Sequence, residues 1–253
     1  MSSAIESKQS IPPPWVEELT LNLRMVEKDP EYRDIRKKAN CSALSIGACP
    51  SLALSKFSKK TVTLDPSLFK SRIGKIFPGA LQFCIFELSN LSQQIEFTSL
   101  LNQARSLTPN QFVKNYEELE HQSALKTKRI LKRCLPSEYW PHFTMIRVPD
   151  SFDLHYLVQQ ALGHSKKIWE RHEPLFPGRP PYSGTWDPVP DDEKEFLTAL
   201  IDNRSRMSDP NPKVSARAME DYHTMKTYHN TCHSGDFHTR LERRIQHIEK
   251  IEH

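Results

Sequence analysis

Residues 81–97 read LQFCIFELSNLSQQIEF and carry the clearest structural signal in the chain. Their apolar side chains recur every three or four positions along one stripe, formed by Leu81, Cys84, Ile85, Leu88, Leu91 and Ile95. This spacing is that of a helix with one buried side, and the stretch is longer than a typical strand. We therefore predict a core helix here and a mainly α fold around it.

The glycine and proline counts favour the same fold class. The 253 residues include 7 Gly and 19 Pro, whereas average usage would give roughly 17 Gly. Few positions can then adopt the positive φ angles that phosphate-binding loops and tight hairpins need. Several prolines instead follow a residue that can cap a helix, as in Asp29-Pro30, Asp65-Pro66 and Thr108-Pro109. The counts argue against nucleotide-binding folds and many-stranded sheets, and for helices.

Proline also indicates how the chain is divided. Residues 174–190, PLFPGRPPYSGTWDPVP, contain six prolines and exclude a regular helix. We predict a disordered tail over 1–14, a helical body over 15–173, an extended arm over 174–190 and a smaller helical unit over 191–253. Within the body, residues 41–63 fit either a short helix or strands, and Asp150 is expected to cap the helix after it.

Cysteine usage and the N-terminus indicate the compartment. The five cysteines are scattered and odd in number, with no Cys-x-x-Cys pair. This is not the pattern of a secreted disulfide framework. No signal peptide or presequence is recognisable, and no apolar stretch approaches the ~20 residues that cross a bilayer. We expect an intracellular protein, cytoplasmic or nuclear, without a membrane span.

The N-terminal half is basic. Residues 1–135 have a net charge of +7 and residues 136–253 one of −3. The densest positive run is KTKRILKR, which contributes Lys126, Lys128, Arg129, Lys132 and Arg133. Like charges this close repel unless an anion pairs with them, so the run is a candidate nucleic-acid-binding site. The alternative is an ordinary solvated helix face near a C-terminus, where cations suit the helix dipole.

The arm carries three large aromatic residues, Phe176, Tyr182 and Trp186. A purely flexible linker does not require them, and such side chains often anchor interfaces. We predict that they dock either on a protein partner or on the chain's own helical body.

The C-terminal region is rich in histidine. His223, His229, Cys232 and His238 follow the spacing H-x5-H-x2-C-x5-H. Imidazole and thiolate are zinc ligands, so these four are candidate metal ligands. The alternative is a set of polar surface histidines on two helices, with Cys232 at their junction. Zinc is the one cofactor that the sequence leaves open.

No catalytic motif is present. The chain lacks G-x-S-x-G, H-E-x-x-H and G-x-x-x-x-G-K-[ST]. We therefore expect a non-enzymatic helical interaction protein, a subunit or adaptor of a larger assembly with protein partners. The alternatives are an RNA-binding or regulatory protein that uses the basic half, and a zinc-stabilised module.

Overall fold

The computed structural model describes residues 14–49, 51–184, 191–207, 209–232 and 236–251. Side chains are described over the same ranges except in 14–16, 191–192, 228–232 and 236–241. The predicted tail therefore lies almost entirely outside the described residues. The chain forms two compact units. Unit 1 comprises residues 1–92 and 129–146, and unit 2 comprises residues 93–128 and 147–253.

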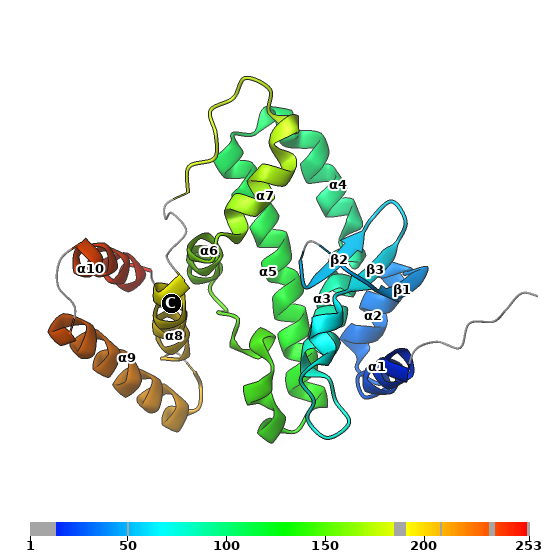
Figure 1. Cartoon of the computed structure of the whole chain (residues 1–253), viewed down its shortest axis with the longest axis horizontal. Coiled ribbons are helices and arrows are strands. Elements are labelled where there is room, and N and C mark those ends of the chain that lie inside the picture. Colours follow the sequence, from blue (N-terminus) through cyan, green and yellow to red (C-terminus); the bar gives the residue numbers. More distant parts are fainter. Residues whose placement is uncertain (1–13, 50, 185–190, 208, 233–235, 252–253) are drawn as a thin grey trace, which may run out of the picture. The chain divides into compact units, whose positions relative to one another are not determined.

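The fold is mainly helical, as predicted from the sequence (Figure 1). The α-helices of the described residues are α1 (Pro14–Arg24), α2 (Pro30–Ala39), α3 (Pro78–Ser92), α4 (Gln94–Gln103), α5 (Pro109–Cys134), α6 (Phe152–Ala161), α7 (His164–His172), α8 (Asp191–Arg206), α9 (Pro212–Cys232) and α10 (Asp236–Glu249). The strands are β1 (Ala43–Ile46), β2 (Ala53–Lys56) and β3 (Thr61–Leu64).

Helix α3 is the centre of unit 1. Helix α2 packs against it, and strands β2 and β3 contact it as well. The predicted apolar stripe from Leu81 to Leu91 is buried, and so are polar residues on its other sides, such as Gln82 and Glu87. A helix enclosed on several sides buries side chains outside its apolar stripe, which the stripe alone does not indicate. The core-helix prediction is confirmed.

The prediction for Ile95 is wrong. Helix α3 ends at Ser92 and a separate helix, α4, begins at Gln94. Ile95 follows that break and is 83% exposed. A helical stripe keeps its direction only while the helix is continuous, so the interruption at Gln93 removes Ile95 from the buried face.

Residues 41–63 form strands, which decides between the two readings that the sequence allowed. The three-stranded sheet has the order β1-β3-β2. Strand β1 pairs in parallel with β3, with Ala43 opposite Thr61. Strand β2 pairs antiparallel with β3, with Lys56 opposite Thr61. Val62 and Leu64 of β3 point into the unit 1 core.

The predicted helix caps are largely confirmed. The Asp29 carboxylate accepts the Tyr32 amide at the start of α2. The Thr108 hydroxyl accepts the Gln111 amide at the start of α5, while the Gln111 side chain accepts the Thr108 amide. Asp65 caps a short 3-10 helix, Pro66–Phe69.

The predicted cap at Asp150 is wrong. Ser151 caps α6, because its hydroxyl reaches the Leu154 amide. The Asp150 carboxylate instead accepts a bond from Lys128 at 2.8 Å. The residue that caps a helix is the one whose side chain reaches the free backbone amides of the first turn. The carboxylate of Asp150 is instead held by its ion pair with Lys128.

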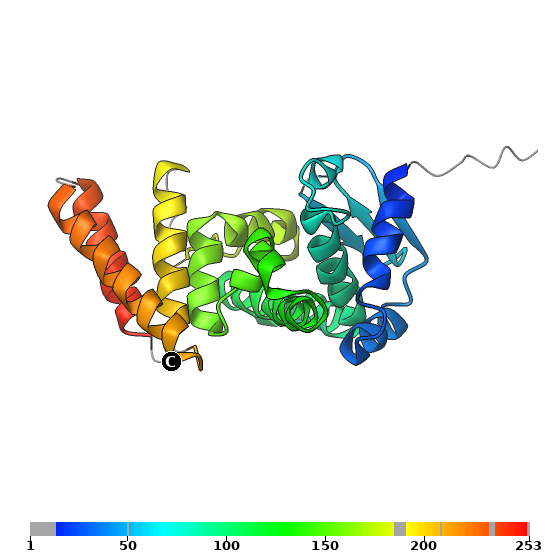
Figure 2. The same ribbon diagram turned by 90° about the horizontal axis from the view of Figure 1, so that it is seen from below.

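Unit 2 has its own core. Leu154 and Leu157 of α6 pack with Leu200 of α8, Tyr222 of α9 and Ile248 of α10. Figures 1 and 2 show α8, α9 and α10 lying side by side. A second apolar region surrounds Phe112, whose ring lies close to those of Tyr116 and Phe176.

The compact units do not follow the division predicted at 174–190. Helices α6 and α7 precede that segment but belong to the same unit as α8, α9 and α10. The reason is packing, because the buried faces of α6 and α8 meet in one core. Helix α5 is shared, with residues up to Lys128 in unit 2 and from Arg129 onward in unit 1.

Candidate functional site

The arginines of the basic run are paired within the chain. Arg133 donates to both carboxylate oxygens of Asp29, at 2.7 and 3.0 Å, and also to Glu31 at 2.8 Å. Arg129 binds the same Glu31. Burial opposes ionisation of Asp29, but the Arg133 bonds and the Tyr32 amide lower the pKa of its carboxyl group. These two arginines therefore join α5 to the start of α2.

The lysines of the run also have neighbours. Lys128 Nζ donates to the Val148 carbonyl and to Asp150, both at 2.8 Å. Lys132 Nζ lies 5.4 Å from the centre of the Trp140 ring, a cation–π distance. Lys126 is half-buried. The structure thus gives most of this run intramolecular partners, and nucleic-acid binding by these five residues stays a prediction.

The described part of the arm docks on its own unit. Phe176 is 4% exposed, and its ring centre lies 5.2 Å from that of Phe112 and 5.3 Å from that of Trp169. The hydroxyl groups of Tyr182 and Tyr156 are 3.2 Å apart. Trp186 lies outside the described residues. Phe176 and Tyr182 therefore contribute to unit 2 itself, and partner docking stays a prediction.

The C-terminal histidine and cysteine cluster is only partly described. His223 is exposed on α9. The side chains of His229, Cys232 and His238 lie outside the described residues. The structure therefore does not test the predicted zinc set.

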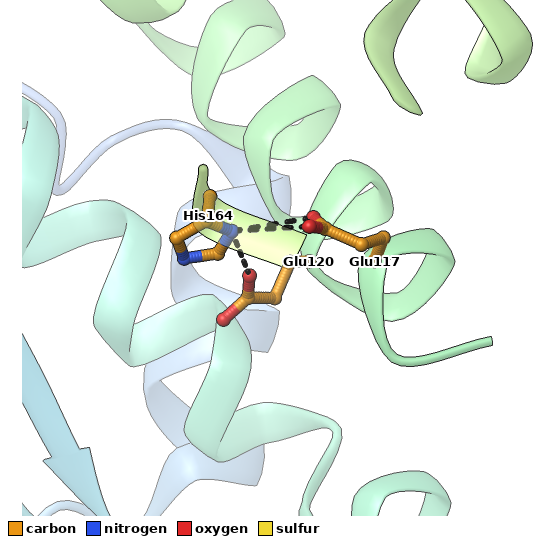
Figure 3. Close-up of side chains that lie close together, drawn as sticks. All are labelled: Glu117, Glu120 and His164. Atoms are coloured by element: carbon orange, nitrogen blue, oxygen red, sulfur yellow. Dashed lines mark hydrogen bonds and ion pairs between the residues drawn. The ribbon is translucent and has the colours of Figure 1, made fainter. Parts of the chain in front are cut away.

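A different cluster of possible ligands lies inside unit 2. Glu117 and Glu120 of α5 face His164 at the start of α7 (Figure 3). His164 Nδ1 is 3.2 Å from Glu117 Oε1, 3.4 Å from its Oε2 and 3.7 Å from Glu120 Oε2. One donor atom from each of the three residues fits within 4.8 Å of the others. The arrangement can hold either a proton or a metal ion.

Local structure explains how these side chains meet. Glu117 and Glu120 are three positions apart on α5, which places them on one face of the helix. Gly163 has φ of 77° and separates α6 from α7. A glycine adopts this left-handed conformation at little cost, and the turn brings His164 to the first position of α7. The next residue, Ser165, donates its hydroxyl to Glu117 Oε1 at 2.7 Å.

The electrostatics of the cluster are unusual. The Glu117 side chain is fully buried, whereas that of His164 is 40% exposed. Burial alone would lower the pKa of His164, but the charge of Glu120 and the bond to Glu117 outweigh it and raise the pKa to about 9. In the described residues the partners of Glu117 are His164 and Ser165, with no Arg or Lys in contact. The imidazolium is thus the cation that offsets a buried carboxylate.

Two buried histidines lie near this cluster. The rings of His121 and His155 stack with their centres 4.5 Å apart. His121 Nε2 donates to the Pro149 carbonyl at 2.7 Å, since a carbonyl oxygen only accepts. Burial lowers the pKa of both, and the charge of His164, together with that of His121 when it is protonated, lowers the pKa of His155 further. Both rings are therefore neutral at pH 7.

Unit 2 is expected to lose stability as the pH falls below about 6.5. The folded-state pKa values of His121 and His155 are below those of the unfolded chain, so acid favours the unfolded state. The raised pKa of His164 has the opposite effect, but mostly above pH 6.5, so the net loss of stability is expected between pH 6.5 and 5. Urea unfolding, followed by hydrogen exchange of unit 2 peptides at pH 6.5 and 5, measures it.

The matched variants for this pH profile are His155→Gln and, at an exposed position of α9, His223→Gln. His155→Gln should reduce the difference in unit 2 stability between the two pH values, and His223→Gln should leave this difference as in the wild type. A wild-type unit 2 that is equally stable at pH 6.5 and 5 contradicts the assignment.

Sequence reasoning missed the Glu117, Glu120 and His164 cluster. The local signal is Glu-x-x-Glu on a helix, which is common on solvated surfaces. The third residue is 47 positions from Glu117. Searches for closely spaced His and Cys therefore point to the C-terminus instead.

No helix in the described part of the chain is long and apolar enough to cross a membrane. Comparison of the chain with protein-family models, with curated proteins and with solved structures finds no match.

Proposed function

We propose that this chain is a non-enzymatic helical binding protein whose unit 2 holds a divalent transition-metal ion between Glu117, Glu120 and His164. The observation that carries the proposal is the convergence of three ligand atoms from two helices on one point. The wider expectation of a subunit or adaptor of an assembly stays a prediction.

The spacing of the ligand atoms suits a metal ion. With metal–ligand bonds of about 2.0–2.2 Å, neighbouring ligands of a tetrahedral site lie roughly 3.3–3.5 Å apart. His164 Nδ1 lies 3.2 Å from Glu117 and 3.7 Å from Glu120. Small side-chain rotations would complete the geometry. Three protein ligands leave a fourth position for water, which the partial exposure of His164 allows.

Charge also favours a dication here. Among these three side chains alone, one imidazolium leaves the two carboxylates with a net charge of −1, whereas a divalent ion on a neutral imidazole balances them. Ser165 bonds Glu117 and would orient that ligand, a role that surrounding groups commonly have at metal sites. The imidazole selects transition metals such as Zn²⁺ over Mg²⁺ and Ca²⁺.

Zinc titration tests the proposal. Calorimetry of the metal-free full-length chain at pH 7.5 should show a zinc site at Glu117, Glu120 and His164, and the variants below assign it to these ligands. Because the pKa of His164 is about 9, binding should release about one proton per zinc ion, seen as a dependence of the measured heat on the buffer. Glu120→Gln and His164→Gln should each weaken the site by about 100-fold.

Glu118→Gln is the matched control, because Glu118 is an exposed neighbour on α5. It should leave zinc affinity unchanged. A second control, His229→Asn with Cys232→Ser, removes two ligands of the C-terminal cluster. The proposal is overturned if the wild type binds no zinc, or if zinc is lost with the C-terminal variant and kept in His164→Gln.

A further inference from the structure

The outer face of the unit 1 sheet is polar and partly open. The register places Ala43 and Ser45 of β1, Thr61 and Thr63 of β3, and Leu54 and Lys56 of β2 on one side. The opposite side carries Val62 and Leu64, which enter the core with α3. The outer side thus has three hydroxyl groups and a lysine, all at least partly exposed, and none of its six residues is acidic or aromatic.

A cluster of lysines adjoins this face. The segment after α2 is fixed to the turn between β2 and β3, because the Ser42 amide donates to the Lys60 carbonyl at 2.7 Å. The Ser42 hydroxyl also reaches the Lys59 and Lys60 carbonyls, at 2.8 and 3.0 Å. These bonds bring the C-terminal end of α2, which carries Lys37, next to the turn.

The charge of this region is one-sided. Residues 33–61 contain seven Lys or Arg and one acidic residue, Asp34, a net charge of +6. Asp34 is paired with Lys38, and Arg36 is paired with Glu27 outside this range. Lys37, Lys56 and Lys59 are exposed, and none of them forms an ion pair with the described residues. In contrast to Lys128, Arg129 and Arg133 of α5, these three have no carboxylate partner in the part of the chain that the structure describes.

We propose that the outer sheet face, the β2–β3 turn and the end of α2 bind the sugar-phosphate backbone of a nucleic acid. Lysines supply the attraction to phosphate, and hydroxyl groups supply hydrogen bonds to phosphate and sugar. Base recognition in single strands uses stacking on aromatic side chains. The outer sheet face has none, and Phe57 of the turn packs against the unit 1 core. Binding is therefore independent of base sequence. The surface lies in unit 1 and does not depend on the metal proposed for unit 2.

Fluorescence anisotropy of the full-length chain with a labelled single-stranded RNA tests the proposal. The wild type should bind at 50 mM salt, and the affinity should fall steeply as salt rises, since bound counterions are released. Replacing Lys37, Lys56, Lys59 and Lys60 together by Gln should weaken binding at least about tenfold and reduce the salt slope by about 2–3. A second RNA of different base composition should bind equally well.

A variant of equal charge separates a site from general attraction. Arg24, Lys28, Lys70 and Lys75 are exposed residues of unit 1 that lie outside the 33–61 segment, and their joint replacement by Gln should change affinity less than threefold. Equal losses in the two variants overturn the proposal, as does the absence of RNA binding at 50 mM salt. Binding to polyglutamate or to vesicles of anionic lipid in place of RNA also overturns it.

Discussion

Replacing Phe176 by alanine is expected to destabilise unit 2 by about 3–5 kcal/mol. The side chain is buried against Phe112 and Trp169. Its removal costs the transfer energy of the ring and leaves a cavity among aromatic residues that cannot all move into it. Hydrogen exchange of unit 2 peptides in urea measures the loss, and proteolysis near the exposed Arg179 reports release of the arm.

Two variants of the arm make this result specific. Tyr182→Phe removes only the hydroxyl that meets Tyr156, so it should cost about 1 kcal/mol. Arg179→Ala, on the exposed side of the arm, should cost less than Phe176→Ala by several-fold. If Phe176→Ala leaves unit 2 as stable as the wild type, the intramolecular docking of the arm is wrong, and docking on a partner gains support.

Replacing Arg133 by methionine is expected to destabilise unit 1 by about 3 kcal/mol. The Asp29 side chain is 3% exposed, and Arg133 offsets its charge through two hydrogen bonds. Removing one partner of a buried pair leaves an uncompensated charge, which typically costs 3–5 kcal/mol. We take the lower end of this range because the Arg133 side chain is 44% exposed, so that in the variant water can partly replace the guanidinium group beside Asp29. Hydrogen exchange of α2 and α3 peptides in urea gives the value.

A double-mutant cycle isolates this ion pair. Asp29→Asn removes the charge and keeps a side chain that can cap α2. In that background Arg133→Met should cost less than about 1 kcal/mol. The pH dependence has a definite sign, because the Arg133 bonds hold the pKa of Asp29 low. The difference in free energy of unfolding between the wild type and Arg133→Met should therefore become smaller as the pH falls and Asp29 becomes protonated. A difference that stays constant down to pH 3 contradicts the role of Arg133 in offsetting the Asp29 charge.

The local features of the fold were the most predictable from sequence. The apolar stripe from Leu81 to Leu91 and the caps at Asp29 and Thr108 depend on residues within a few positions of one another. Periodicity and cap chemistry therefore capture them. The predictions for Ile95 and Asp150 are wrong because each depends on something outside that range, namely the break after α3 and the ion pair with Lys128.

The candidate site was the least predictable. In the sequence, Glu117 and Glu120 are indistinguishable from acidic residues on the exposed face of a helix. Only the folded chain brings His164 of α7 to them. His164 is one of eleven histidines and has no distinctive neighbours in sequence. Charge density is likewise a poor guide. In the densest basic run, on α5, several side chains are paired with carboxylates, whereas the more scattered Lys37, Lys56 and Lys59 are exposed to solvent.

By itself, then, the sequence determined that this chain is mainly helical, where several helices begin, and that its N-terminal part carries the positive charge. These properties follow from backbone preferences and composition, which act locally. Only the tertiary structure decided which charges are neutralised, that 41–63 forms a sheet, and that the described part of the arm packs on its own unit. It also decided that His164 meets Glu117. Each of these outcomes depends on the energy of contacts between residues that are far apart in the sequence. Those contacts form only when burial of the chain brings the two partners together.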